Sequence, residues 1–132
     1  MCIRDSKHNF KGLNITIPYK QDIISKLDYL AKSSEKTGVV NTIEFKKNKL
    51  IGHNTDIIGF EKSFKPIFEN RNNALILGSG ASSKTIKFVL DNLNISSKII
   101  GRKKKISYQN INQDMIEKHD ICLLYTSDAA DE

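Results

Sequence analysis

The stretch that decides the fold reads GLNITIPYK and occupies residues 12–20. Apolar Leu13, Ile15 and Ile17 alternate with polar residues there, a period of two that is typical of a half-buried β-strand. Pro18 cannot donate a hydrogen bond to a sheet ladder, but its fixed φ suits the first turn of a helix. We therefore expect a strand that turns through the proline directly into a helix.

This turn would bring three polar side chains, Asn14, Thr16 and Lys20, to one rim of a sheet. Open α/β folds bind their ligands at such a rim, beyond the ends of the strands. The sequence therefore predicts that any chemistry takes place here.

Both ends of the chain look like translated sequencing adapters. Residues 1–6 back-translate as ATG TGT ATA AGA GAC AG, and residues 122–127 as TGT CTC TTA TAC ACA TCT, which contains the reverse complement of the first stretch. Opposite ends of a natural gene have no reason to be reverse complements, and residues 128–132 look like a continuation. We expect residues 1–6 and 122–132 to be non-native, and residues 7–121 to be an internal fragment of a longer chain.

Setting these ends aside changes the composition. Residues 7–121 keep 20 of the 21 Lys and Arg and 11 of the 15 Asp and Glu, which gives a net charge of +9. Cys2 and Cys122 lie in the excluded ends, so we expect no disulfide, no metal site and no thiol nucleophile. Apolar runs such as residues 74–77 are far shorter than the ~20 residues that span a bilayer. We expect a soluble, cytoplasmic protein with no membrane segment.

After the proline, the pattern predicts a helix and then a hairpin. Apolar residues recur at helical spacing over residues 22–36, and Gly38 would end that helix. Strands are expected over residues 39–45 and 49–53, joined by a polar turn.

A further helix would begin at Thr55 or Asp56, either of which can cap it, and end at Pro66. Its expected apolar face consists of Ile57, Ile58, Phe60 and Phe64.

A β-α-β unit follows residue 70. Residues 74–77 form a continuous apolar run, typical of a strand in a parallel sheet covered on both faces. The sequence Gly-Ser-Gly at residues 78–80 precedes a predicted helix, and a second strand is expected over residues 98–100. This length fits a dinucleotide-binding fold. The helix should bury Ile86, Val89, Leu90 and Leu93, a short helix is expected over residues 112–118, and a third strand would begin at residues 120–121.

The glycine turn is a candidate pyrophosphate site, because backbone N–H groups at a helix start can approach an anion closely. The candidate cofactor-binding residues are Gly78, Ser79, Gly80, Ala81 and Ser82. The third position of the dinucleotide fingerprint is Ser83, where Gly or Ala is usual, so the match is partial. The alternative is a tight turn that holds no ligand.

The end of the second predicted strand indicates which dinucleotide is bound. NAD-binding units usually carry a carboxylate there, whereas this chain has Arg102 and Lys103 followed by two further lysines. A guanidinium makes forked contacts with phosphate, which favours NADP over NAD. The alternative is a solvated basic turn, which we prefer for Lys104 and Lys105.

Lys20 and Asp56 are the candidate pair for proton transfer. Reduction of a ketone needs a hydride from a nicotinamide and a proton for the developing alkoxide, and a lysine near a carboxylate can supply that proton. The alternative is an exposed lysine and an aspartate that only caps a helix. His53 is assigned no role.

Neutral hydrogen-bonding groups near the strand ends suit a polyhydroxylated substrate, although each alone is also common in turns. They are Asn14, Thr16, Asn41 and Thr55.

Three blocks, followed by the glycine turn, resemble the shikimate dehydrogenase family. They read NITIPYK at residues 14–20, GVVNT at residues 38–42 and GHNTDIIG at residues 52–59. The resemblance spans nearly all of residues 11–102. It implies an oxidoreductase that reduces 3-dehydroshikimate with NADPH in aromatic amino-acid biosynthesis, the chorismate pathway.

The resemblance also implies roles for individual residues. Lys20 would be the catalytic lysine, and Asp56 its partner and a ligand of a substrate hydroxyl. Thr16 and Asn41 would lie at the substrate, with Asn14 and Thr55 close by. The turn from Gly78 to Ser82 would bind the NADP pyrophosphate, and Arg102, with Lys103 beside it, the 2′-phosphate.

The chain departs from the family pattern at the second cofactor-turn glycine, here Ala81, and at the end of the second strand. The family's Asn-Arg-Thr is replaced there by residues 101–103, Gly-Arg-Lys. The serine pair that holds the substrate carboxylate would precede Lys7.

We therefore expect an α/β protein with a substrate-binding domain followed by a Rossmann-like NADP-binding domain, both incomplete. Residues 7–69 would be the later part of the first domain and residues 70–121 the first half of the second, with the active site in the cleft between them. Alone, the fragment is expected to be poorly folded and inactive.

Two alternatives remain open. One is a quinate/shikimate dehydrogenase using NAD or NADP. The more distant one is a non-enzymatic basic module that binds nucleic acid, suggested by the net charge of +9, although residues 102–105 hold no aromatic side chain.

Overall fold

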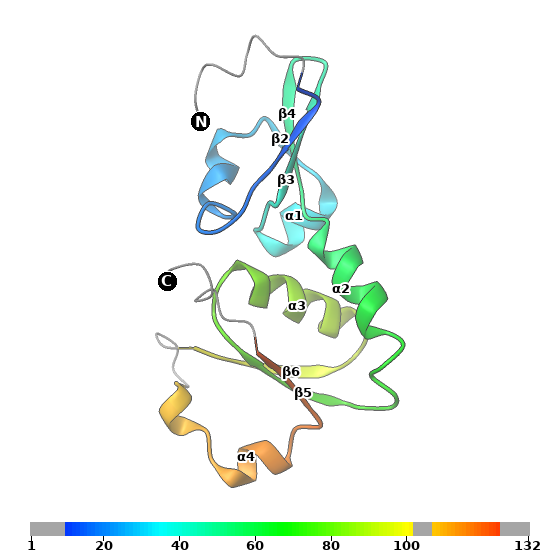
Figure 1. Ribbon diagram of the computed structural model, residues 1–132, viewed down its shortest axis with the longest axis vertical. Helices are drawn as coiled ribbons and strands as arrows, with labels where there is room; N and C mark the ends of the chain where they lie inside the picture. Colours follow the sequence, from blue (N-terminus) through cyan, green and yellow to red (C-terminus); the bar gives the residue numbers. More distant parts are fainter. Residues whose placement is uncertain (1–9, 102–106, 125–132) are drawn as a thin grey trace. The chain divides into compact units, whose positions relative to one another are not determined.

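The structure is a computed structural model that describes residues 10–101 and 107–124. The chain divides into two compact units, and the division falls between Thr55 and Asp56. The predicted domain boundary between residues 69 and 70 stays a prediction. Figure 1 shows the elements of each unit.

The first unit is built around a four-stranded sheet in the order β1-β3-β4-β2. β1 and β4 both pair antiparallel with β3, whereas β2 runs parallel to β4. The strands are β1 (Gly12–Asn14), β2 (Tyr29–Leu30), β3 (Thr42–Lys46) and β4 (Lys49–His53). The predicted hairpin is confirmed, although its first strand begins at Thr42 and not at Val39.

The hairpin turns at Lys47 and Asn48, whose φ angles are 49° and 58°. Two-residue loops of type I′ need positive φ at both central positions, because only that twist matches the flanking strands. Asparagine tolerates this conformation well, whereas lysine has no local hydrogen bond to compensate for it.

The prediction that Pro18 opens a helix is wrong. Residues 17–21 form a turn, in which the Ile17–Pro18 peptide bond is cis and the Tyr19 N–H donates to the Thr16 carbonyl at 3.0 Å. The Lys20 carbonyl accepts a hydrogen bond from the Val40 N–H at 2.8 Å. Because this carbonyl is bound to the neighbouring segment, the chain does not become helical until Asp22.

The single helix predicted over residues 22–36 is also wrong. This segment contains the 3-10 helix η2 (Asp22–Lys26), strand β2 and the start of helix α1 (Lys32–Thr37). The Asp28 N–H donates to the Leu50 carbonyl at 3.0 Å, and the Asp28 carboxylate accepts from the Leu50 N–H at 2.8 Å. These bonds to β4 take the place of helical ones.

Two apolar residues of that segment, Leu27 and Leu30, are nevertheless partly buried. Leu27 and Leu30 pack so closely on Gly52 that a Cβ there would lie 2.6 Å and 3.0 Å from their methyl carbons. Gly38 ends α1 with a φ of 63°, as the sequence predicted.

The second unit is a β-α-β arrangement with a three-stranded parallel sheet in the order β6-β5-β7. Figure 1 shows α3 on one side of this sheet and α4 on the other. Its elements are α2 (Asp56–Phe64), β5 (Asn73–Leu77), α3 (Ala81–Asn92), β6 (Ser96–Ile100), the 3-10 turn η3 (Tyr108–Asn110), α4 (Gln113–Glu117) and β7 (Ile121–Leu124).

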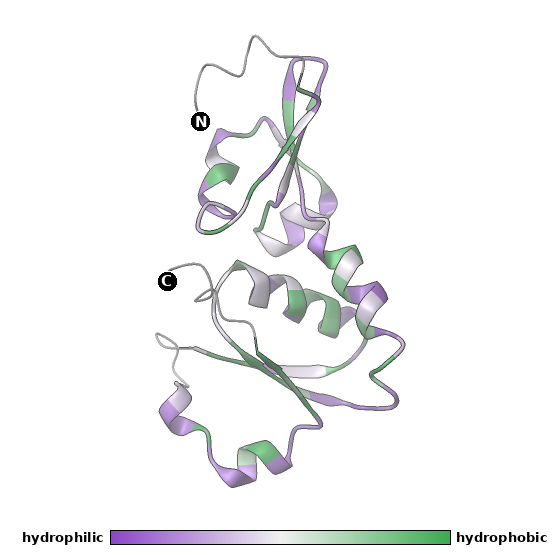
Figure 2. Ribbon diagram, in the orientation of Figure 1, coloured by the Kyte–Doolittle hydropathy of each residue, from purple (hydrophilic) through white to green (hydrophobic). Residues whose placement is uncertain are grey.

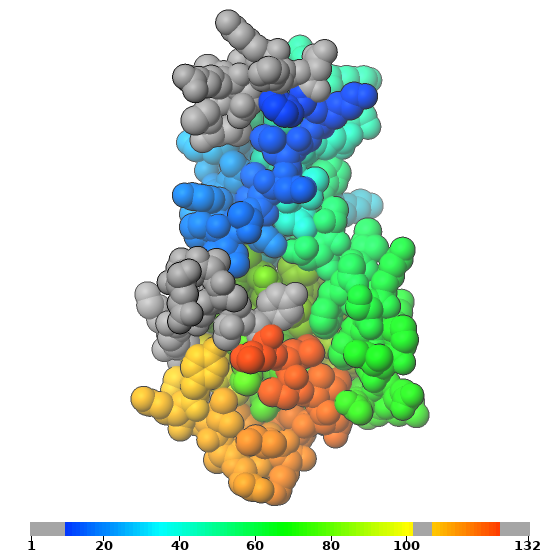
Figure 3. Space-filling model, in the orientation of Figure 1, coloured from blue at the N-terminus to red at the C-terminus, as the bar shows by residue number. Residues whose placement is uncertain are grey.

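The predicted strands and helices of this unit are confirmed. β7 begins at the expected place and takes in residues 122–124 of the stretch that we expect to be non-native. Figure 3 shows α4, in orange, at the surface of the unit, where four of its five residues are exposed.

The core of the second unit lies between α3, α2 and the sheet. Figure 2 shows hydrophobic residues on β5 and α3, the elements that supply much of it. Phe64 stacks between Phe60 and Phe68, with ring centroids 5.1 Å and 5.6 Å away. Ile58, which we expected on the apolar face of α2, is 58% exposed because it lies on the opposite side of that helix from Phe60 and Phe64. The buried core residues are Phe64, Ala74, Ile76, Ile86, Leu90, Ile95 and Ile121.

Candidate active site and cofactor turn

In the first unit, backbone pairing brings most of the predicted substrate-binding residues to one end of the sheet. Asn14 pairs with Thr42, and Thr42 pairs with His53, so these three residues form a row across the last rungs of β1, β3 and β4. Beyond this row the Ile15 N–H donates to the Asn41 carbonyl at 2.7 Å. The segment that carries Asn14, Thr16 and Lys20 therefore runs alongside the segment that carries Asn41.

Asn41 is joined to Thr55 by three hydrogen bonds. The Asn41 Nδ2 donates to the Thr55 hydroxyl at 2.9 Å, and the Asn41 Oδ1 accepts from the Thr55 N–H at 3.0 Å and from its hydroxyl at 3.2 Å. The Thr42 hydroxyl also donates to Asn41 Oδ1, at 3.1 Å. One amide thus fixes the start of the chain segment that leads into Asp56.

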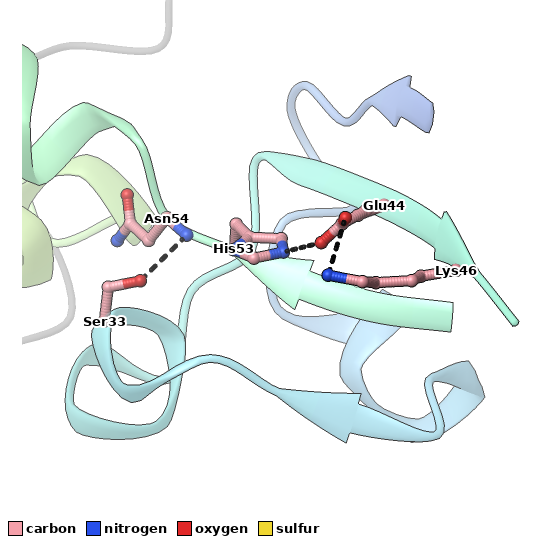
Figure 4. A network of polar contacts seen from close by, with 5 residues as sticks. All are labelled: Ser33, Glu44, Lys46, His53 and Asn54. Atoms are coloured by element: carbon pink, nitrogen blue, oxygen red, sulfur yellow. Dashed lines mark hydrogen bonds and ion pairs between the residues drawn. The ribbon is translucent and has the colours of Figure 1, made fainter. Parts of the chain in front are cut away.

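A buried polar group beneath this junction was missed by the sequence reasoning. Asn54 is 2% exposed; its Nδ2 donates to the Thr37 hydroxyl at 3.0 Å and its N–H to the Ser33 hydroxyl at 3.3 Å. Figure 4 shows the Ser33–Asn54 bond. The sequence feature that could have revealed it is the spacing of its partners, Ser33 and Thr37, which are four residues apart and so lie on one face of a helix. These contacts tie α1 to the end of β4 and so position Thr55.

His53 lies opposite Thr42 in the β3–β4 hairpin. Its Nε2 lies 3.1 Å from Glu44 Oε2, and Glu44 Oε1 lies 3.8 Å from the Lys46 ammonium (Figure 4). The first contact joins β4 to β3 and the second lies within β3, and both are at a partly exposed surface. They give His53 a structural partner, in keeping with its having no assigned role.

Lys20 and Asp56, the predicted proton-transfer pair, occupy different units. Lys20 lies at the end of the proline turn in the first unit, half-buried, with its carbonyl bonded to Val40. Asp56 is the first residue of α2, in the second unit. Their predicted meeting at one substrate stays a prediction.

The glycine turn follows β5 in the second unit as predicted. Gly78 has a φ of 130°, a conformation that favours glycine, and its N–H donates to the Ile100 carbonyl at 2.8 Å. Ser79 and Gly80 are exposed, and a Cβ built on Gly80 would meet no atom within 4 Å. The turn therefore leaves open space above its backbone.

The first turn of α3 fits an anion such as pyrophosphate. Gly80 is the N-cap and has no side chain that could cap the helix, and the first turn holds no acidic residue. The Ser83 hydroxyl donates to the Gly80 carbonyl at 2.6 Å and so does not occupy an N–H group. The amides at this helix start are the kind that bind phosphate in dinucleotide folds.

The strand order places this turn at a topological switch point. β6 lies on one side of β5 and β7 on the other, although β6 and β7 follow β5 in sequence. Ligands of open parallel sheets bind beyond the carboxyl ends of the strands where the order reverses, which here is the end of β5. Arg102 and Lys103, the predicted 2′-phosphate ligands, lie outside the described residues.

The described residues hold neither a metal-binding cluster nor a membrane-spanning helix. Within residues 10–101 and 107–124, no three His, Cys, Asp or Glu side chains gather in a way that could hold a metal ion. Among the same residues, no helix is both long enough and apolar enough to cross a membrane.

Several known proteins similar to this chain are shikimate dehydrogenases. The family model of the shikimate dehydrogenase substrate binding domain matches residues 2–43. A shikimate dehydrogenase (NADP(+)) of Clostridium botulinum, strain Hall, is 46% identical over 90 residues, which are 67% of this chain and 35% of that protein. The chain belongs to the shikimate dehydrogenase family. The resemblance read from its motifs is thus confirmed.

Other shikimate dehydrogenases agree in sequence and fold. That of Staphylococcus aureus, strain Newman, is 41% identical over 115 residues, which are 82% of this chain and 42% of that protein. The crystal structure of the Aquifex aeolicus shikimate dehydrogenase matches 94% of this chain with a TM-score of 0.83 at 29% identity, and the match covers 51% of that chain. The predicted α/β class, with a substrate-binding and a Rossmann-like part, is confirmed. The chain spans between about a third and a half of the length of these shikimate dehydrogenases.

Proposed function

We propose that the protein to which this chain belongs is a shikimate dehydrogenase that reduces 3-dehydroshikimate to shikimate with NADPH. The observation that carries the proposal is that one chain of this family joins a polar sheet rim, in the first unit, to an uncapped glycine turn after a parallel strand, in the second. The names of the Clostridium and Staphylococcus relatives, shikimate dehydrogenase (NADP(+)), support both the substrate and the cofactor. Because both are small metabolites of the cell interior, we place the protein in the cytoplasm.

Bound NADPH would supply a hydride to the carbonyl carbon, while the carbonyl oxygen gains a proton and the ketone becomes a hydroxyl. The Lys20 side chain would lie next to that oxygen. Its ammonium can stabilise the developing negative charge, and either it or the Asp56 carboxyl can deliver the proton.

The polar rim of the first unit would bind the ring hydroxyls. Asn14 and Thr16 are exposed there, so their side chains can hydrogen-bond a ligand without first losing a buried partner. Asn41 and Thr55 already hold each other, and this pair fixes the chain just before Asp56. Asp56 would accept a hydrogen bond from a substrate hydroxyl as well as pair with Lys20.

The second unit would bind the cofactor. The residues from Gly78 to Ser82 would hold the pyrophosphate at the start of α3, where the N-cap residue Gly80 has no side chain that could bind the amides. Arg102 and Lys103 would hold the 2′-phosphate, as the basic sequence predicts.

The test is an assay of NADPH consumption by the protein from the complete reading frame that contains residues 7–121. We expect turnover with 3-dehydroshikimate, a preference for NADPH over NADH, and little oxidation of quinate in the reverse direction. Equal use of quinate and shikimate, or a preference for NAD, would instead favour a quinate/shikimate dehydrogenase. Absence of turnover with either substrate would refute the proposal.

A further inference from the structure

Ser79, the middle residue of the glycine turn, lies against the end of the neighbouring strand β6. A Cβ built on Gly101 would lie 2.5 Å from Ser79 Cβ and 2.6 Å from Ser79 Oγ. Real Cβ atoms essentially never approach other atoms so closely. The Ser79 side chain therefore occupies the space in which a side chain at residue 101 would begin.

In dinucleotide-binding folds, a side chain that begins in this space contacts the bound cofactor. The residue that follows the second strand normally reaches the 2′ position of the adenosine ribose, and in NAD-binding proteins it is a carboxylate. Residue 101 directly follows β6, is buried and has no side chain. The hydroxyl of Ser79 is the polar group found in its place.

We infer that Ser79 is a specificity-determining residue, whose hydroxyl donates a hydrogen bond to the 2′-phosphate of the dinucleotide. This inference rests on the proposed use of NADP. Ser79 is exposed, and the Gly78 N–H bond to the Ile100 carbonyl holds the turn beside β6, so the hydroxyl is held at the strand end and open to a ligand. A neutral hydroxyl can serve a phosphate as a donor, whereas a carboxylate at this position would repel it.

The alternative is that Ser79 only fills space and shapes the turn. The two roles predict different ligand dependence. A turn-shaping residue affects the pyrophosphate, which NADP and NAD share, whereas a hydroxyl that binds the 2′-phosphate affects only ligands that carry that group.

The experiment measures binding of 2′,5′-ADP and of 5′-AMP by calorimetry, using the protein from the complete reading frame. The two ligands differ only in the 2′-phosphate. Replacement of Ser79 by alanine keeps the Cβ and removes only the hydroxyl. Loss of a charge-assisted hydrogen bond corresponds to roughly tenfold weaker binding, so we expect the Ser79→Ala dissociation constant for 2′,5′-ADP to rise by about that factor. The dissociation constant for 5′-AMP should stay the same.

Ser63→Ala is the matched control. Ser63 lies exposed on α2, where its hydroxyl donates to the Gly59 carbonyl at 3.0 Å, and the substitution makes the same chemical change. It should leave both dissociation constants unchanged.

An equal change for both ligands in Ser79→Ala, or no change for either, would overturn the inference while leaving the proposed function intact. Wild-type protein that does not prefer 2′,5′-ADP over 5′-AMP would overturn both the inference and the assignment of NADP.

Discussion

Asp28 shows how a single carboxylate can decide the course of a segment. Its oxygens accept from the Leu50 N–H at 2.8 Å and from the Lys49 ammonium at 3.2 Å, and the Lys49 ammonium also lies 5.8 Å from the centre of the Tyr29 ring. The Leu50 N–H first, and the Lys49 side chain after it, hold the pKa of the Asp28 carboxyl below its usual value. These are contacts between residues 20 or more positions apart, which helical periodicity cannot reveal.

The lowered pKa of Asp28 makes its contribution to stability depend on pH. Because the folded pKa lies below the unfolded one, the contribution is complete above the unfolded pKa and is lost as pH falls through the folded pKa. We expect Asp28→Asn to lower the melting temperature at pH 7, and the difference from wild type to shrink on acidification below about pH 4. Thermal melts of the protein from the complete reading frame across this range test it. Lys49→Met should reduce the pH dependence of the melting temperature less than Asp28→Asn does, because the Asp28 carboxylate keeps its hydrogen bond from the Leu50 N–H. A melting-temperature difference between Asp28→Asn and wild type that does not change with pH would contradict this prediction.

Replacement of Lys20 is expected to change the rate of catalysis and not the stability of the protein. Lys20→Met keeps much of the aliphatic stem and removes the ammonium, so we expect kcat for 3-dehydroshikimate to fall by roughly 10²- to 10⁴-fold, as for loss of a general acid. The KM for NADPH should change little, because the predicted cofactor residues are elsewhere. Lys26→Met, at an exposed lysine in the same unit, is the control. A Lys20→Met enzyme with kcat within twofold of wild type would remove Lys20 from the mechanism.

At the scale of elements, the sequence was sufficient where local chemistry and hydrophobic pattern agree. The β5–turn–α3–β6 series was predicted because a continuous apolar run, two glycines and a helical face follow one another without competition. The hairpin was predicted for the same reason. The single helix predicted over residues 22–36 is wrong because the spacing of Leu27 and Leu30 fits a helical face as well as it fits their actual contact with Gly52. Only the long-range pairing of β2 with β4 distinguishes the helix from the observed structure.

The hairpin tip offers a test of local backbone preference. Lys47 has a φ of 49°, which costs a non-glycine residue without local compensation, whereas Asn is favoured there. We expect Lys47→Asn to raise the free energy of unfolding by roughly 0.5 kcal/mol, and Asn48→Ala, at a φ of 58°, to lower it by about 1 kcal/mol. Chemical denaturation of the protein from the complete reading frame measures the free energy of unfolding of both variants. Shifts of the same sign would show that the turn conformation does not control stability.

At the scale of the whole molecule, the family and the two-part organisation could be predicted from residue blocks, whereas the roles of the site residues stay predictions. Asn14, Asn41 and Thr55 were expected near strand ends; backbone bonds bring Asn14 and Asn41 to one end of the sheet, and Asn41 holds Thr55 there. Asn54 and its partners were not predicted, because a buried amide and two hydroxyls have no periodic signature. Lys20 and Asp56 lie in different units, so their meeting at one substrate stays a prediction.

The three-stranded sheet of the second unit leads to a prediction about the chain as it stands. β6 and β7 form the two edges of the described sheet, and parallel sheets normally have both faces covered and further strands at their edges. We expect these 132 residues, expressed alone, to show no cooperative thermal transition and no NADPH consumption with 3-dehydroshikimate. The protein from the complete reading frame is the control. Turnover by the short chain near that of the longer one would contradict this.

The shared space of Ser79 and residue 101 also constrains the history of this protein. A lineage whose second strand ends in asparagine, as in the family pattern, has no room for a side chain at 79 in the position found here, because a Cβ at 101 would lie 2.5 Å from the Ser79 Cβ. Such a lineage must change residue 101 to glycine before, or together with, the adoption of this turn position, since the two Cβ atoms would otherwise overlap. Ancestors reconstructed along this branch should therefore include none that combines this turn position with a side chain at residue 101.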